Sequence, residues 1–214
     1  MTRTTRLATT RCCLVLQACF LAASIVIATP TRATERSPAE TVRIDSQRSH
    51  AEFSLRAMVL MVVSGQFTAV SGGVTFNREL DVGWVDVSID ANSLVMSSPE
   101  RKQWARSDEF FDSARHPEIR FVSDPISRTL MRDGGPLRGR LSLRGIDRIL
   151  DLTVSPADCN EPGSGCPLHV RGSISRSDFG MISKRAVLGD RVTLDISVFV
   201  VPTDDQESRL GIPN

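Results

Sequence analysis

Tyrosine is absent from this sequence of 214 residues, aromatic residues make up only 5% of it, and its formal net charge at pH 7 is +1. The near balance of charge excludes the basic surface of a nucleic-acid-binding protein, so we expect no nucleic acid partner. Only three histidines are present, His50, His116 and His169, and none has neighbours that would form a catalytic triad or a metal cluster. We therefore expect no enzymatic activity, no metal and no cofactor.

Cysteine is scarce in the part of the chain that we expect to fold. Three of the five cysteines lie within the first 28 residues, and only Cys159 and Cys166 lie beyond them. These two flank the turn-rich stretch 160–165, and a disulfide that closes so short a loop would contribute roughly 2–3 kcal/mol. Metal binding is the alternative, but two cysteines without a nearby histidine do not complete a zinc site. We predict the disulfide.

The first 28 residues have the layout of a secretory signal peptide. Three arginines precede an apolar run from Cys12 to Ala28, and small and polar residues follow as far as Ala33. Cleavage after Ala28 or after Ala33 fits this layout. An uncleaved membrane anchor stays open, because the run approaches the ~20 residues of a spanning helix, and so does lipidation of Cys19. We expect a periplasmic or secreted protein.

Between residues 42 and 201, apolar and polar residues alternate with a period of two, which predicts strands with one buried face. Short turn signals separate these strands and no βαβ spacing occurs, which favours an antiparallel barrel or sandwich. A barrel of about eight strands would leave room for one small ligand. The same residues would also suit a filled core, so both interiors are open at this point. We expect residues 34–41 to form a loose leader and residues 202–214 a mobile tail.

Six consecutive apolar residues, from Met58 to Val63, interrupt the alternation. We expect them to form a strand that is buried on both faces. The alternative is an apolar rim at the mouth of a pocket, or a surface that contacts a membrane or a partner, because a large exposed apolar patch marks an interaction site.

A short helix and a corner stand out among the predicted strands. Ser98 and Pro99 are a typical helix cap and first helical residue, and the predicted helix runs toward the adjacent Phe110 and Phe111. Pro117 then favours an extended chain. We expect this Phe-Phe corner to place a large apolar group on a sheet face. Three carboxylates frame the pair, and we interpret them as a solvated helix end rather than as catalytic groups: Asp108, Glu109 and Asp112.

These segments occur in the order found in a known family. Together they resemble the YceI-like, or polyisoprenoid-binding, periplasmic proteins over about residues 42–201. The resemblance implies a lipocalin-like barrel whose pore holds a long isoprenoid or another amphiphilic chain. The segments that carry it are Ile44-Asp45 with Ser49 and Phe53, Gly65-Gln66-Phe67, Ser93 with Arg101 and Arg106–Asp112, His116-Pro117 with Phe121, Gly139 with Leu141, Leu143 and Gly145, and Arg176–Met181.

We therefore predict an all-β fold, an antiparallel eight-stranded lipocalin-like barrel with a short helix before the Phe-Phe corner. The predicted pore lining is apolar: Phe53, Leu55, Phe67, Phe76, Val87, Ile89, Phe110, Phe111, Phe121, Leu143, Phe179 and Met181. Four cations are candidate contacts for a phosphate or carboxylate head group, with an ordinary surface charge or ion pair as the alternative for each: Arg101, Arg176, Lys184 and Arg185.

The function that we expect is that of an exported, non-catalytic lipid-binding or carrier protein. Its partner would be an isoprenoid or acyl-chain amphiphile, because burial of each methylene of such a chain contributes roughly 0.8 kcal/mol. The alternative is a protein-interaction module, in which the barrel is filled and residues 58–63 dock on a partner. Transient contact with a membrane and formation of a homodimer are also open.

Overall fold

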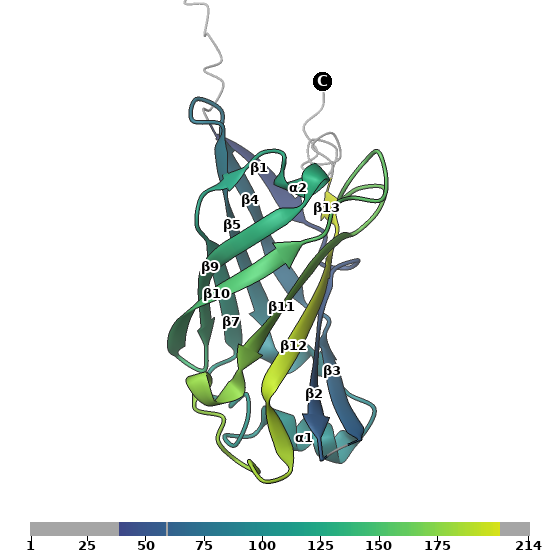
Figure 1. Ribbon diagram of the computed structural model, residues 1–214, viewed down its shortest axis with the longest axis vertical. Coiled ribbons are helices and arrows are strands. Elements are labelled where there is room, and N and C mark those ends of the chain that lie inside the picture. The colour runs from purple at the N-terminus through teal and green to yellow at the C-terminus, as the bar shows by residue number, and fades with distance from the viewer. Residues whose placement is uncertain (1–38, 59, 202–214) are drawn as a thin grey trace, which may run out of the picture. The chain divides into compact units, whose positions relative to one another are not determined.

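The computed structural model describes residues 39–58 and 60–201, which form a mostly β structure (Figure 1). The expected signal peptide at residues 1–28 with its cleavage site, the first part of the expected leader and the expected tail at residues 202–214 lie outside the described residues. The described strands form one antiparallel sheet, and the helical elements are short.

The strands are β1 (Ala39–Ile44), β2 (His50–Ala57), β3 (Met61–Phe67), β4 (Val70–Asn77), β5 (Val82–Asp90), β6 (Leu94–Val95), β7 (Glu118–Ser123), β8 (Ile126–Ser127), β9 (Gly135–Leu143), β10 (Ile146–Val154), β11 (Leu168–Ser175), β12 (Leu188–Val198) and β13 (Val200–Val201). The helices are α1 (Pro99–Arg106) and α2 (Leu130–Asp133), and the 3₁₀ turns are η1 (Ala91–Ser93) and η2 (Arg176–Phe179).

Consecutive strands join into eight longer runs, of which β9, β10 and β11 are continuous and five are interrupted once. The interrupted runs are β1–β2, β3–β4, β5–β6, β7–β8 and β12–β13. β12 pairs with β2, and its continuation β13 pairs with β1, so the last run is hydrogen-bonded to the first and the sheet closes. The predicted class, an all-β antiparallel barrel, is confirmed, and the larger strand count reflects the interruptions.

A buried serine occupies the interruption of the first run. Between β1 and β2, Ser49 Oγ donates a hydrogen bond to the carbonyl of Phe199 at 3.2 Å and accepts one from its N–H at 2.9 Å. The hydroxyl thus satisfies the backbone of Phe199, where β12 passes into β13. β1 itself begins at Ala39, so residues 39–41 of the expected leader belong to the strand.

Inward and outward side chains alternate along the runs as the sequence indicates. In β2, for example, Ala51, Phe53, Leu55 and Ala57 are buried, and the residues between them are exposed or half-buried. The core is a single cluster of aliphatic and phenylalanine side chains drawn from almost every strand. The barrel interior is therefore apolar along its length.

The Phe-Phe corner lies at one end of this interior. The side chain of Ser98 caps α1 by accepting a hydrogen bond from the N–H of Arg101 at 3.2 Å, and Pro99 begins the helix. Beyond α1, Phe110 and Phe111 are both buried, with ring centroids 4.7 Å apart. The corner therefore places two large groups in the core, where the sequence led us to expect one.

Four rings pack together at this end, and we call Phe53, Phe67, Phe110 and Phe111 the phenylalanine cluster. The ring of Phe111 lies 5.2 Å from those of both Phe53 and Phe67, in edge-to-face arrangements. Edge-to-face pairs contribute about 0.5–1.5 kcal/mol beyond the apolar area that they bury. The cluster thus attaches the irregular segment after α1 to β2 and β3.

The interpretation of residues 58–63 as a strand buried on both faces is wrong. Met58, Leu60, Met61 and Val62 are exposed, and Val63 is the first side chain of β3 that is buried. The physical reason is that these residues form the turn of the β2–β3 hairpin and the first residues of β3. No neighbouring strand within the described residues covers their outward side chains.

Cys159 and Cys166 are joined by a disulfide in the loop between β10 and β11, with their Cα atoms 6.3 Å apart. Inside this loop, the N–H of Gly163 donates to the carbonyl of Cys166 at 2.8 Å. The carbonyl of Gly163 in turn accepts from the N–H of Val200, also at 2.8 Å. The disulfide-closed loop is therefore anchored on β13, where the sheet closes.

The phenylalanine cluster generates a prediction about stability. Replacing Phe111 by alanine should lower the free energy of unfolding by about 3–5 kcal/mol, because the substitution removes a buried ring and leaves a cavity. Urea denaturation measures this change. Leu80→Ala is the matched control, because Leu80 is exposed and its substitution should change stability by no more than about 0.5 kcal/mol. Equal effects of the two substitutions would contradict the role given to the cluster.

Candidate functional site

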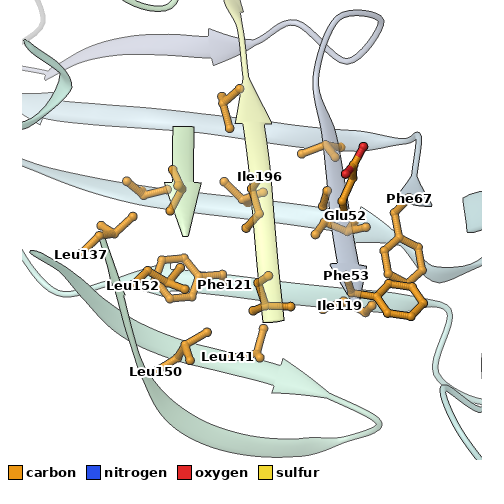
Figure 2. A pocket seen from close by; sticks show the side chains of 18 of the residues that line it. Glu52, Phe53, Phe67, Ile119, Phe121, Leu137, Leu141, Leu150, Leu152 and Ile196 are labelled. Carbon is orange, nitrogen blue, oxygen red and sulfur yellow. The ribbon is translucent and has the colours of Figure 1, made fainter. Parts of the chain in front are cut away.

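An internal cavity of about 160 Å³ runs inside the barrel. Its wall consists of aliphatic and phenylalanine side chains, and the surface that it presents to the interior is apolar. Figure 2 shows lining residues from β2, β3, β7, β9, β10 and β12 around the space. Glu52 is the one charged residue on the wall, and its side chain is exposed on the outward face of β2.

The space remains because mainly aliphatic groups line the middle of the barrel. Val85, Val87 and Ile89 on β5 point inward, as do Leu194 and Ile196 on β12, yet all five are only half-buried. Inward side chains that retain accessible surface border a void. A cavity needs a volume of about 10–15 Å³ to hold one water molecule, and an apolar cavity stays dry even when water would fit. The interior is thus hollow and suited to apolar groups.

Different elements line the two ends of the cavity. At one end lie Phe110 and Phe111 of the cluster, together with Met181. At the other end lie Met131 of α2 and Val200 of β13. Because both ends are apolar, the space accommodates a hydrocarbon chain along the barrel, and any polar group attached to that chain must lie outside it.

Nine of the twelve residues predicted to line the pore do so: Phe53, Phe67, Val87, Ile89, Phe110, Phe111, Phe121, Leu143 and Met181. The other three, Leu55, Phe76 and Phe179, are buried in the core but do not line the cavity. Phe76, for example, lies beneath the Arg128 guanidinium, 4.7 Å from the ring centroid.

Several lining residues were not among the predicted ones. Those on β12 could have been identified from the sequence, because Val192, Leu194, Ile196 and Val198 alternate with polar residues. Met131 could not have been found in this way. It belongs to α2, a helix of four residues without a side-chain cap hydrogen bond.

Arg176 is not a head-group contact, which corrects one of the predicted cation roles. Its side chain is fully buried, and its Nε donates to the carbonyl of Gly189 at 3.0 Å. Its two terminal nitrogens donate to the carbonyls of Met181, Ser183 at 2.9 Å and Leu188 at 3.2 Å. Burial lowers the pKa of the Arg176 guanidinium from its ordinary value, and the nearby Asp190 carboxylate acts in the opposite direction. Arg176 therefore holds the loop between η2 and β12 in place.

The other three cations lie on the surface at the α1 end of the barrel. Lys184 Nζ lies 4.5 Å from the centroid of the Trp104 ring, and Arg101 and Arg185 are exposed. None of the three lines the cavity. Contact between any of them and a head group stays a prediction.

Two of the three carboxylates near the corner, those of Glu109 and Asp112, are bound to neighbouring side chains. Asp112 is buried with a positive φ of 52°, and its carboxylate pairs with Arg115 at 2.8 Å. Glu109 accepts a hydrogen bond from the indole N–H of Trp104 at 2.9 Å. The interpretation of these groups as a solvated helix end is therefore wrong for Asp112, which stabilises the corner.

The described residues contain no group of three or more His, Cys, Asp or Glu side chains that could hold a metal ion. His116 Nε2 lies 3.9 Å from Asp112, and His50 Nε2 lies 3.8 Å from Glu52. Each of these histidines thus has one carboxylate neighbour, and neither histidine lines the cavity. Among the helices in this part of the chain, none is long and apolar enough to cross a membrane.

Comparisons with known proteins agree with this architecture. The family model of the YceI-like domain matches residues 43–200. A UPF0312 protein of Shewanella denitrificans is 28% identical over 191 residues, which cover 86% of this chain and 95% of the relative. A UPF0312 protein of Yersinia enterocolitica is 26% identical over 162 residues, which cover 73% and 83% of the two chains.

Two solved structures have the same fold. BcnA of Burkholderia cenocepacia superimposes with a TM-score of 0.60 at 20% identity, covering 74% of this chain and 99% of BcnA. A polyisoprenoid binding domain from Saccharophagus degradans superimposes with a TM-score of 0.57 at 18% identity, covering 74% and 97% of the two chains. At these identities the likeness shows the fold alone.

The burial of Arg176 generates a prediction. Arg176→Met should lower the free energy of unfolding by about 3 kcal/mol or more, because each buried carbonyl that loses its donor costs about 1–3 kcal/mol. Urea denaturation measures the loss, and hydrogen exchange should rise in residues 181–189. Arg101→Met is the control, since Arg101 is exposed and should change stability by about 0.5 kcal/mol or less. A variant of full stability with impaired ligand binding would instead favour a head-group role for Arg176.

Proposed function

The chain belongs to the YceI-like domain family, and we propose that it is an exported, non-catalytic protein that binds a lipid inside its barrel. The ligand that we propose is an isoprenoid or another long-chain amphiphile, with its hydrocarbon tail in the cavity and its polar group outside. The observation that carries the proposal is the apolar cavity of about 160 Å³ in the interior of a closed barrel.

The energetics favour occupation of this cavity. An empty cavity in a protein core costs about 24 cal/mol per Å³ relative to a filled one, which is about 4 kcal/mol for a volume of this size. A hydrocarbon chain that enters the space recovers this cost, and burial of each methylene contributes roughly 0.8 kcal/mol in addition. Affinity can thus arise from apolar contact alone, without a hydrogen bond in the interior.

The class of ligand is supported by one structural relative. The Saccharophagus degradans domain with the same fold is named as a polyisoprenoid binding domain. An isoprenoid tail also suits the present wall, because its branched methyl groups can pack among valine, leucine and isoleucine side chains. An unbranched acyl chain remains the second candidate within the same class of amphiphile.

Export is supported by two features. The layout of residues 1–28 is typical of a secretory signal peptide. The disulfide between Cys159 and Cys166 suits an oxidising compartment such as the periplasm. We therefore propose a periplasmic or secreted location.

A protein-interaction module with a filled barrel, the alternative drawn from the sequence, is not supported. A filled barrel requires side chains in the middle of the interior, and the half-buried Val87, Ile89 and Ile196 border a cavity instead.

Blocking the cavity tests the proposal. In Ile196→Trp, a larger side chain enters the space from β12, and binding of geranylgeraniol and of oleic acid should fall about tenfold or more. Thr193→Trp is the matched control, because Thr193 lies on the outward face of the same strand and is exposed. Native mass spectrometry and displacement of a fluorescent fatty-acid probe measure binding, and circular dichroism checks that both variants remain folded. Wild-type protein that binds neither ligand, or equal binding by the two variants, would contradict the proposal.

A further inference from the structure

An exposed apolar tip lies at the end of the barrel that carries α1 (Figure 1). It consists of Met58, Leu60, Met61 and Val62 at the turn of the β2–β3 hairpin, and we call these four residues the apolar tip. Leu60 is 93% exposed and Met58 is 68% exposed. Scattered single apolar residues are normal on a protein surface, but four within one hairpin form a patch that needs a partner.

The backbone of the tip is also unusual. Met58 has a φ of 54°, in the left-handed region that a large side chain seldom adopts. Glycine or asparagine would serve this turn at lower cost. A methionine that keeps a strained conformation while its side chain is exposed suggests that the side chain has a use at this position.

A second loop lies beside the tip and contributes positive charge. The N–H of Met58 donates to the carbonyl of Val187 at 2.6 Å, and Leu188 pairs with Ala57 at the start of β12. We call the segment Met181–Leu188 the basic loop. It carries Lys184 and Arg185, together with exposed Ile182 and Val187.

The charged side chains at the turn of the β2–β3 hairpin and in the basic loop are all positive. The hairpin segment Arg56–Ser64 and the basic loop contain Arg56, Lys184 and Arg185 but no aspartate or glutamate. None of these three cations forms an ion pair within the described part of the chain. The nearest carboxylate that follows the loop, Asp190, accepts hydrogen bonds from the backbone N–H and the hydroxyl of Ser177.

We propose that the apolar tip and the basic loop together dock the protein on the surface of an anionic lipid bilayer. The tip enters the boundary between head groups and acyl chains, and Arg56, Lys184 and Arg185 contact the lipid phosphates. This combination of an apolar insertion with neighbouring cations is typical of proteins that lie on a membrane surface. Basic residues near an anionic membrane strengthen such binding by electrostatic attraction to the lipid phosphates.

The shape and charge of this end favour a bilayer over a protein partner. The tip is a narrow projection on a hairpin turn, whereas a stable protein interface usually needs about 800 Å² on each partner. Docking two copies through this end would bring the three unpaired cations of each copy together, which is unfavourable. A bilayer accepts a small projection and supplies the complementary negative charge.

The inference rests on the proposed function and extends it. The basic loop begins at Met181, a cavity-lining residue, and the hairpin continues from β2, which carries Phe53 of the phenylalanine cluster. Docking at this end therefore places the phenylalanine-lined end of the cavity next to the bilayer. The lipid-binding barrel would then collect or deliver its ligand at a membrane surface.

Vesicle flotation tests the proposal with the exported protein. The protein should float with vesicles that contain phosphatidylglycerol, bind vesicles of phosphatidylcholine more weakly, and lose affinity as salt increases. Leu60→Asp with Met61→Asp should weaken binding to the anionic vesicles about tenfold or more. Lys184→Glu with Arg185→Glu should also weaken it and should reduce the dependence on salt.

Leu80→Asp is the matched control. Leu80 is an exposed leucine in the turn between β4 and β5, at the opposite end of the run that begins at Met61, so this variant should bind vesicles as the wild type does. Failure of the wild type to float, or equal loss in Leu80→Asp and in the tip variant, would overturn the proposal. So would a dimer that dissociates in the tip variant without any vesicle binding, because the tip would then be a contact between copies.

A separate measurement keeps this inference distinct from the proposed function. The tip variant should still bind geranylgeraniol or oleic acid in solution, because its substitutions lie outside the cavity. The cavity-blocked variant Ile196→Trp should still float with anionic vesicles. If the tip variant lost ligand binding in solution while it remained folded, the tip would belong to the cavity, and the assignment of a separate docking surface would be wrong.

Discussion

The packing of four phenylalanine rings at one end of the barrel is the contact on which the rest of the structure depends. Phe110 and Phe111 come from an irregular segment after α1, and Phe53 and Phe67 come from β2 and β3. These large rings fill the interior where they meet. Farther along the barrel most inward residues are valine, leucine and isoleucine, with Phe121 among them, and these side chains leave space in the centre. Four large rings therefore occupy one end of the cavity, whereas mainly aliphatic side chains line its middle.

An apolar wall limits how such a protein can distinguish its ligands. The wall presents no hydrogen-bonding group to the interior, so selection inside the barrel depends on chain length, branching and shape. Any discrimination between head groups must come from residues outside the cavity. Arg176, which resembles a head-group contact in sequence, instead supports the basic loop from within. Its guanidinium positions Lys184 and Arg185 at the surface by fixing the loop that carries them.

How accurately a feature was predicted from the sequence depended on whether a local residue pattern distinguishes it. Period-two alternation identified most strands and most of the wall, because an inward residue of a barrel must be apolar and its neighbour usually meets solvent. It did not distinguish Val87, which borders the cavity, from Leu55, which packs in the wall, since both are inward and apolar. The run from Met58 to Val63 was misinterpreted for a related reason. A stretch without polar residues looks the same whether strands cover it on both faces or a turn exposes it.

By itself, the sequence determined the class of fold, the capped helix before the Phe-Phe corner and the apolar character of the interior. Each of these follows from local spacing or from the residue type at a single position, so it can be recognised along the chain. The tertiary structure alone decided that the interior is hollow, that Arg176 is buried and that the apolar tip is exposed beside the basic loop. These features depend on how far side chains from separate runs reach toward one another and on which segments meet in space, and no local pattern contains that information.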